Sequence, residues 1–329
     1  MTHIAVVGMG GTIAMAPSAS GGIVPSLDAD DLIAAVPGLD APELKITATT
    51  LRSLPSPSLG FADLVALSDR VRAEIAGGAD GVVITHGTDT IEETAFFLDL
   101  TVPEDTPVVV TGAMRHSDAP GADGPANLYA AIRVACSPDA RGLGCLVVMA
   151  DEVHGARFVR KSHTSSTGAF VSPGFGPLGL VVEGDPRIRG AARTGLTLPA
   201  DPRVGERRVG MITMALADDG TLLRLAATDP PVFDGLVIAG LGAGHVPAGL
   251  VPLVAEHAAR IPVVLSTRTG AGSVLRQTYG YPGSERDLLE RGLIHSGFLD
   301  PAKARILLQL LLATGATREQ SKAAYERFR

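Results

Sequence analysis

Short apolar runs rich in β-branched residues alternate with helical patterns along the first half of the chain, and this alternation constrains the fold most. The runs that predict strands are residues 4–7, 46–50, 81–85, 107–111 and 145–150. Helical spacing of apolar residues lies between them, at 29–35, 61–76, 91–100 and 126–135. Strands and helices that alternate at this period form a parallel sheet with helices on both faces. We therefore expect an α/β protein with a flavodoxin- or Rossmann-like sheet.

A second, shorter set of the same kind follows, and the chain of 329 residues is long enough for about two domains of ~150 residues each. Its predicted strands are 209–216, 235–239 and 262–266, and its predicted helices are 247–259 and 301–314. The segment between the two sets lacks periodicity and is rich in Pro, Gly and Arg, which is typical of an exposed connection. We expect an N-terminal domain at 1–185, a linker at 186–206 and a smaller α/β domain at 207–329.

Composition and charge exclude several classes of protein. Aromatic residues make up only 4% of the chain and Trp is absent, so the core is expected to consist of Val, Ile, Leu and Ala, as in buried parallel sheets. The net charge is −7 and no basic block is present, so we expect no nucleic-acid partner. No run approaches the ~18 apolar residues of a membrane span, and the first residues show no charged n-region, long apolar segment or cleavage site, so we expect no leader. A soluble cytoplasmic protein is expected, with Cys136 and Cys145 as reduced thiols.

The loop after the first predicted strand contains three glycines close together, in the sequence Gly8-Met-Gly-Gly-Thr-Ile13. Ligands of parallel sheets bind beyond the carboxyl ends of the strands. The loop begins like a dinucleotide fingerprint with Asp28 at the ribose-binding distance, but Ile13 replaces the third glycine and Asp28 suits a helix cap. A nucleotide site is therefore not favoured. Glycines allow a tight backbone that would bring Thr12 to a ligand, although a simple turn stays possible.

A second polar loop, His86-Gly-Thr-Asp-Thr90, follows the strand at 81–85. Thr90 and Glu93 have the spacing of a capping box, which predicts a helix that starts there. Thr88 and Asp89 would then lie at a helix N-terminus, where negative charge is stabilised. The alternative is that these residues only cap the helix. His86 is expected to be structural, because no His-Glu-x-x-His pattern or paired histidine accompanies it.

A third polar segment, residues 157–166, surrounds Lys161 with hydroxyl side chains. Taken alone, Lys161 is an ordinary surface lysine. If it lies near Asp89, it becomes a cation that can take part in proton transfer with a threonine nucleophile.

These segments together resemble the bacterial-type L-asparaginases, an amidohydrolase family that includes glutaminase-asparaginases. The nucleophile motif of that family matches 10–13, and its second signature matches 84–94. Further matching segments are 111–115, 122–125, 127–129, 176–179 and 297–305. The resemblance covers nearly the whole chain. It implies hydrolysis of L-asparagine to L-aspartate and ammonia, with no metal and no organic cofactor.

The resemblance also implies roles for individual residues. Thr12 would be the nucleophile that forms an acyl-enzyme, and Thr88, Asp89 and Lys161 would assist proton transfer and activate water. Asp89 would also hold the α-amino group of the substrate, and Ser56 its α-carboxylate.

Family members assemble as tetramers built from intimate dimers, so the resemblance implies a homo-oligomer, dimer or tetramer, with a small amide substrate. A glutamate of the neighbouring subunit completes each site, and Glu285 matches it by its distance from Asp300-Pro-Ala-Lys-Ala-Arg305.

Departures from the family pattern concern the residues that read the substrate. Many members carry a tyrosine on an N-terminal lid, whereas the first Tyr here is Tyr129 and the lid at 14–25 contains Pro and Gly instead. A Ser-Gln pair becomes Ser56-Pro57. An asparagine-binding residue that the partner subunit supplies in the family is also changed here, in the segment that holds Ala243 and His245. Weak L-asparagine activity, or preference for D-asparagine, glutamine or a larger β-amide, stays open.

Three other functions remain as alternatives. An amidotransferase subunit that supplies ammonia to tRNA-bound substrates resembles this family, but such subunits carry an extra N-terminal domain. A non-catalytic amino-acid sensor would explain the missing Tyr and Gln. A hydrolase with a terminal Thr2 nucleophile is disfavoured, because Thr2 enters the first strand directly.

Overall fold

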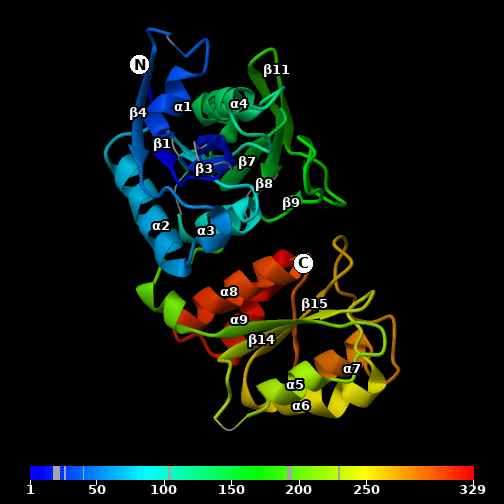
Figure 1. Cartoon of the computed structure of the whole chain (residues 1–329). Coiled ribbons are helices and arrows are strands. Elements are labelled where there is room, and N and C mark those ends of the chain that lie inside the picture. Colours follow the sequence, from blue (N-terminus) through cyan, green and yellow to red (C-terminus); the bar gives the residue numbers. More distant parts are fainter. Residues whose placement is uncertain (18–22, 26, 40, 103–104, 191–194, 229) are drawn as a thin grey trace. The chain divides into compact units, whose positions relative to one another are not determined.

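The computed structural model describes residues 1–329 except 18–22, 26, 40, 103–104, 191–194 and 229. The chain divides into two compact units, residues 1–197 and 198–329 (Figure 1).

An eight-stranded sheet forms the centre of the first unit, in the order β12-β11-β8-β7-β6-β5-β1-β4. Its strands are β1 (Thr2–Gly8), β4 (Leu44–Thr50), β5 (Gly81–Thr85), β6 (Val108–Thr111), β7 (Cys145–Met149), β8 (Glu152–Gly155), β11 (Gly179–Val182) and β12 (Asp185–Ile188). Strands β4, β1, β5, β6 and β7 are neighbours in this order and are parallel. Strands β8, β11 and β12 continue the sheet beyond β7 in antiparallel pairs. Two small antiparallel pairs lie outside this sheet: β2 (Met15–Pro17) with β3 (Ile23–Pro25), and β9 (Arg160–Lys161) with β10 (Phe170–Val171).

Helices cover both faces of this sheet (Figure 1). They are α1 (Ala29–Ala34), α2 (Phe61–Ala76), α3 (Ile91–Thr101) and α4 (Gly124–Cys136), with short 3-10 turns at Thr12–Ala14, Ser56–Ser58 and Pro138–Ala140. Strand β1 shows why two layers form, because alternate side chains of a strand point to opposite faces. Ile4 and Val6 pack in the core under α1 and α4, while Ala5 and Val7 pack in the core with α2 and α3.

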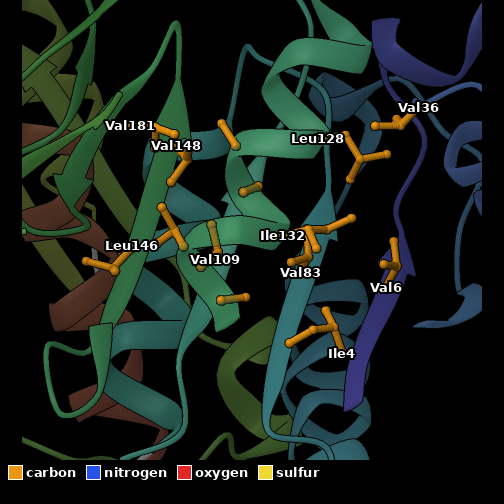
Figure 2. Close-up of a cluster of buried hydrophobic side chains, with 14 of the residues drawn as sticks. Ile4, Val6, Val36, Val83, Val109, Leu128, Ile132, Leu146, Val148 and Val181 are labelled. Carbon is orange, nitrogen blue, oxygen red and sulfur yellow. The ribbon is translucent and has the colours of Figure 1, made fainter. Parts of the chain in front are cut away.

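Figure 2 shows the first of these two cores. Side chains from four parallel strands point toward α4, which contributes Leu128 and Ile132. Both are almost fully buried, with 1% and 0% of their surface exposed. This packing of Val, Ile and Leu is the core expected from a chain so poor in aromatic residues.

The second unit contains a four-stranded parallel sheet in the order β13-β14-β15-β16. Its strands are β13 (Val209–Thr213), β14 (Gly235–Gly240), β15 (Val263–Thr267) and β16 (Ile294–His295). Its helices are α5 (Thr221–Ala226), α6 (Val251–Arg260), α7 (Glu285–Glu290), α8 (Pro301–Ala313) and α9 (Arg318–Tyr325), with 3-10 turns at Pro202–Glu206, Ala248–Leu250 and Glu326–Phe328.

The expected fold class is confirmed, and the differences concern whole strands that were missed and the bounds of single elements. The antiparallel strands β8, β11 and β12 were not predicted, and the strand expected at 209–216 ends at Thr213. Both ends of the expected linker at 186–206 carry regular structure: β12 pairs with β11 at its start, and the 3-10 turn Pro202–Glu206 belongs to the second unit. Along the chain, the boundary between the two units lies between Thr197 and Leu198.

Three further expectations concern single segments. Asp28 caps α1 through a reciprocal pair of hydrogen bonds with Asp31, as the capping interpretation predicted. Residues 18–22 of the expected lid lie outside the described residues. Cys136 and Cys145 are not joined in a disulfide. Within the described ranges, no helix is long and apolar enough to cross a membrane.

Candidate active site

The loops that follow β1 and β5 touch each other at two glycines. The strands are neighbours in the sheet, and the Met9 N–H donates to the Thr85 carbonyl over 2.9 Å. Gly11 has a φ of 86°, and a Cβ added to it would lie only 2.2 Å from the Cα of Gly87. No side chain fits between these backbones, which explains the glycines. Thr12 and Thr88 each follow directly after this contact, so the fold brings their two loops together.

Ser56 joins the same place from a third loop. A Cβ on Gly87 would lie 2.6 Å from both Cβ and Oγ of Ser56, so the serine side chain packs against the bare glycine. Ser56 is only 3% exposed. The hydroxyl of Thr90 donates to the Ser56 carbonyl over 3.3 Å and ties this loop to the start of α3.

That hydrogen bond also corrects an expectation. Thr90 is the residue before the first turn of α3, as predicted, but its side chain makes no capping hydrogen bond, so the expected capping box of Thr90 and Glu93 is wrong. The hydroxyl binds the Ser56 carbonyl instead. A contact between distant loops has replaced a local one here.

Lys161 reaches this site from β9, more than 70 residues away in the sequence. Its Nζ donates to Thr88 Oγ1 over 2.9 Å and to Asp89 Oδ1 over 2.6 Å. The Lys161 side chain is 16% exposed and that of Asp89 is 59% exposed, so the carboxylate faces solvent while it holds the ammonium group. Hydrogen bonds between charged groups are short and strong, and this one fixes the lysine beside a threonine hydroxyl.

Glu92 adds a contact that was not predicted from the sequence. Its Oε2 accepts the backbone N–H of Lys161 over 2.6 Å. The only hint in the sequence is its position three residues after Asp89, at the start of the predicted helix. The partner residue is 69 positions further along the chain, which the sequence does not reveal.

His86 is structural, as its sequence context indicated. It is fully buried, with Nδ1 2.8 Å from the Gly87 carbonyl and Nε2 3.0 Å from Thr94 Oγ1. Burial lowers the pKa of His86 to about 4, although the hydrogen bond to the Gly87 carbonyl opposes this shift. A neutral imidazole thus holds the turn at Gly87, and with it the contact to Gly11.

Glu285 belongs to the second unit, where both of its carboxylate oxygens are already engaged. Oε1 accepts the backbone N–H groups of Thr278 and Tyr279 over 3.1 and 2.9 Å, and Oε2 lies 3.1 Å from His245 Nε2. Burial raises the pKa of Glu285, but the N–H groups of Tyr279 and of Glu285 itself, together with His245, outweigh it and bring the pKa below its usual range. The hydroxyl of Tyr281 lies 2.8 Å from His245 Nδ1, so the carboxylate, imidazole and phenol form a chain.

The described residues contain no group of three or more His, Cys, Asp or Glu side chains that could hold a metal ion. The groups gathered in the first unit are instead two threonine hydroxyls, a serine, a carboxylate and a lysine. Such a set suits nucleophilic attack by a hydroxyl with proton transfer through side chains.

Comparisons with known proteins agree with this class of site. Residues 3–193 match the family model "Asparaginase, N-terminal", and residues 208–325 match "Glutaminase/Asparaginase C-terminal domain". A probable L-asparaginase of Deinococcus radiodurans is 40% identical, over 99% of this chain and 97% of that protein. A glutaminase-asparaginase of Pseudomonas fluorescens is 33% identical, over 95% of this chain and 86% of that protein.

The fold is also similar to that of a solved asparaginase structure. The crystal structure of a probable cytoplasmic L-asparaginase from Campylobacter jejuni has a TM-score of 0.88, with 32% identity and 100% coverage of both chains. The chain belongs to the asparaginase family.

Proposed function

We propose that this protein is an amidohydrolase that converts L-asparagine to L-aspartate and ammonia, in the cytoplasm and as part of asparagine catabolism. The observation that carries the proposal is the position of the Lys161 ammonium between Thr88 and Asp89, beside the loop of Thr12. The names of the relatives that match along nearly the whole chain support the same activity.

In the first half of the reaction, the Thr12 hydroxyl attacks the carbon of the substrate's side-chain amide. A new C–O bond forms, the C–N bond breaks, and the nitrogen takes up the proton that the Thr12 hydroxyl loses and leaves as ammonia. An ester between Thr12 and the aspartyl group remains. The tight Gly10-Gly11 backbone, with φ angles of 89° and 86°, presents Thr12 at the end of β1 for this attack.

In the second half, water hydrolyses this ester. Thr88 and Lys161 form a path for the proton that the water loses, because Nζ of the lysine lies 2.9 Å from the threonine oxygen. Asp89, at 2.6 Å, stabilises the lysine whenever it carries the proton. The Thr12 hydroxyl is regenerated when L-aspartate leaves.

The half-exposed Asp89 carboxylate is suited to bind the α-ammonium group of the substrate, and Ser56 lies close enough in the same loop cluster to bind its α-carboxylate. We further propose a homotetramer in which the Glu285 region of one subunit completes the site of another. Because both Glu285 oxygens are engaged, this region would present His245 and Tyr281 together with the glutamate.

The substrate is the least constrained part of this proposal, since Pro57 offers neither a side-chain acceptor nor an N–H. The test is an ammonia-release panel with purified protein and L-asparagine, D-asparagine, L-glutamine and a larger β-amide. We expect turnover of L-asparagine. Tight binding of L-asparagine without turnover of any amide would contradict the proposal and favour the amino-acid sensor.

A further inference from the structure

Glu92 links the start of α3 to the backbone of Lys161. It is the second residue of α3, and its Oε2 accepts the Lys161 N–H over 2.6 Å. Thr88 and Asp89, which hold the Lys161 side chain, lie in the turn directly before the same helix. Lys161 is therefore attached at both its backbone and its side-chain end to one helix start.

The strand that carries Lys161 is short, and its hairpin is anchored in the core beside α3. Strand β9 contains two residues and pairs with the two residues of β10. Beyond this short ladder, Ser162 N–H and Ser162 Oγ both bind the Ala169 carbonyl, over 2.7 and 2.9 Å. The side chains of Val159, Ala169 and Phe170 are buried in the core that α3 also lines. The hydrogen bond to Glu92 adds a fixed point at the backbone of Lys161 itself.

We propose that Glu92 is a positioning residue for Lys161, which sets the register of the β9 hairpin against the start of α3. The inference rests on the proposed function, because it assigns to Glu92 the placement of a lysine that moves protons in that reaction. The carboxylate accepts the backbone N–H of Lys161 and so holds the backbone at this residue. A small displacement of the backbone there would move the whole side chain and with it Nζ. Misplacement of a reacting group by about 1 Å can cost about 100-fold in rate.

Two substitutions separate this role from a purely electrostatic one. Glu92→Gln removes the charge but keeps an oxygen at the same distance, so it should retain at least about half of the wild-type kcat. Glu92→Asp keeps the charge at the helix N-terminus but shortens the side chain by one methylene. It should lose the contact and lower kcat about 10- to 100-fold with little change in KM. If Glu92 acted only through its negative charge at the helix N-terminus, Glu92→Gln would lose more kcat than Glu92→Asp.

Glu319 provides a matched control, because it is also the second residue of a helix, α9, and is exposed. Glu319→Asp and Glu319→Gln should leave kcat unchanged. Thermal unfolding of every variant checks that the fold is retained.

A second readout does not depend on activity. The chain has four lysines, so acetylation of each by a water-soluble reagent can be followed by peptide mass spectrometry. Lys161 should react several-fold faster in Glu92→Asp than in wild type, while the exposed Lys45 and Lys322 should react equally in both. If the wild type hydrolyses no amide, the proposed function fails, and the acetylation rates still test the inference. Equal Lys161 acetylation in Glu92→Asp and wild type would overturn it, as would loss of kcat in Glu92→Gln as large as in Glu92→Asp.

Discussion

Replacing Gly11 by alanine tests whether the contact between the loops of Thr12 and Thr88 controls the site. Gly11 has φ 86° and ψ 179°, a backbone region that is almost restricted to glycine. The new Cβ would lie 2.2 Å from Gly87 Cα and 2.3 Å from Gly87 N, and backbone atoms on both sides leave it nowhere to move. The two loops must therefore separate.

The expected loss of stability has two parts. The unfavourable backbone conformation costs about 1–3 kcal/mol, and forcing a methyl group into a packed site costs about 1–3 kcal/mol more. Together they give about 4 kcal/mol, which for a unit of this size lowers Tm by about 8–16 °C. Because the loop of Thr12 is displaced, kcat for ammonia release should fall about 100-fold or more.

Gly78→Ala is the control, since Gly78 has a φ of 92° but no atom within 4 Å of the added Cβ. It reports the backbone cost alone, about 2 kcal/mol, and should leave kcat unchanged. Calorimetry and steady-state ammonia release on both variants decide the matter. A Gly11→Ala protein with wild-type kcat and a Tm no lower than that of Gly78→Ala would show that this loop contact does not control the site.

Two further predictions concern pH and substrate binding. Burial holds the His86 pKa at about 4, so between pH 6.5 and 4 the unfolded chain binds a proton that the folded one does not, and stability falls as pH falls. This costs about 3 kcal/mol at pH 4. The stability lost between pH 7 and pH 4 should therefore be about 3 kcal/mol smaller in His86→Gln than in wild type. Denaturant titrations at both pH values that give equal losses for the two proteins would count against this prediction. Pro57→Gln restores a side-chain amide beside Ser56 and should lower KM for L-asparagine about 2- to 10-fold. Ser58→Gln, at the next exposed position of the same turn, should not lower KM. An unchanged KM in Pro57→Gln would contradict a role of position 57 in substrate recognition.

The fold was predictable from the sequence wherever strands are buried on both faces. The run at 81–85 is wholly apolar apart from its ends, and the structure makes it strand β5 with the same bounds. The antiparallel strands β8 and β12 escaped prediction because their residues do not form such runs. Strand β8 contains Glu152 and His154, and β12 contains a proline and two charged residues, so neither has the pattern of a buried strand.

The candidate site was predictable to the extent that its residues lie in motifs. Thr88 and Asp89 stand together before α3 because the sequence places them there, and their pairing with Lys161 was anticipated only as a possibility. Contacts between distant loops could not be predicted from the sequence. The Thr90 hydroxyl binds the Ser56 carbonyl instead of capping its helix, and Glu92 binds a backbone N–H 69 residues away. Spacing along the chain carries no information about such pairs.

The most direct test of the central claim is ammonia release from L-asparagine by Thr12→Ala, measured beside wild type and Thr12→Ser. If the Thr12 hydroxyl is the nucleophile, Thr12→Ala falls to the background rate while its melting temperature stays close to that of wild type. Thr12→Ser, which keeps a hydroxyl, should retain measurable turnover. Ammonia release by Thr12→Ala at the wild-type rate would contradict the assignment of Thr12 as the nucleophile.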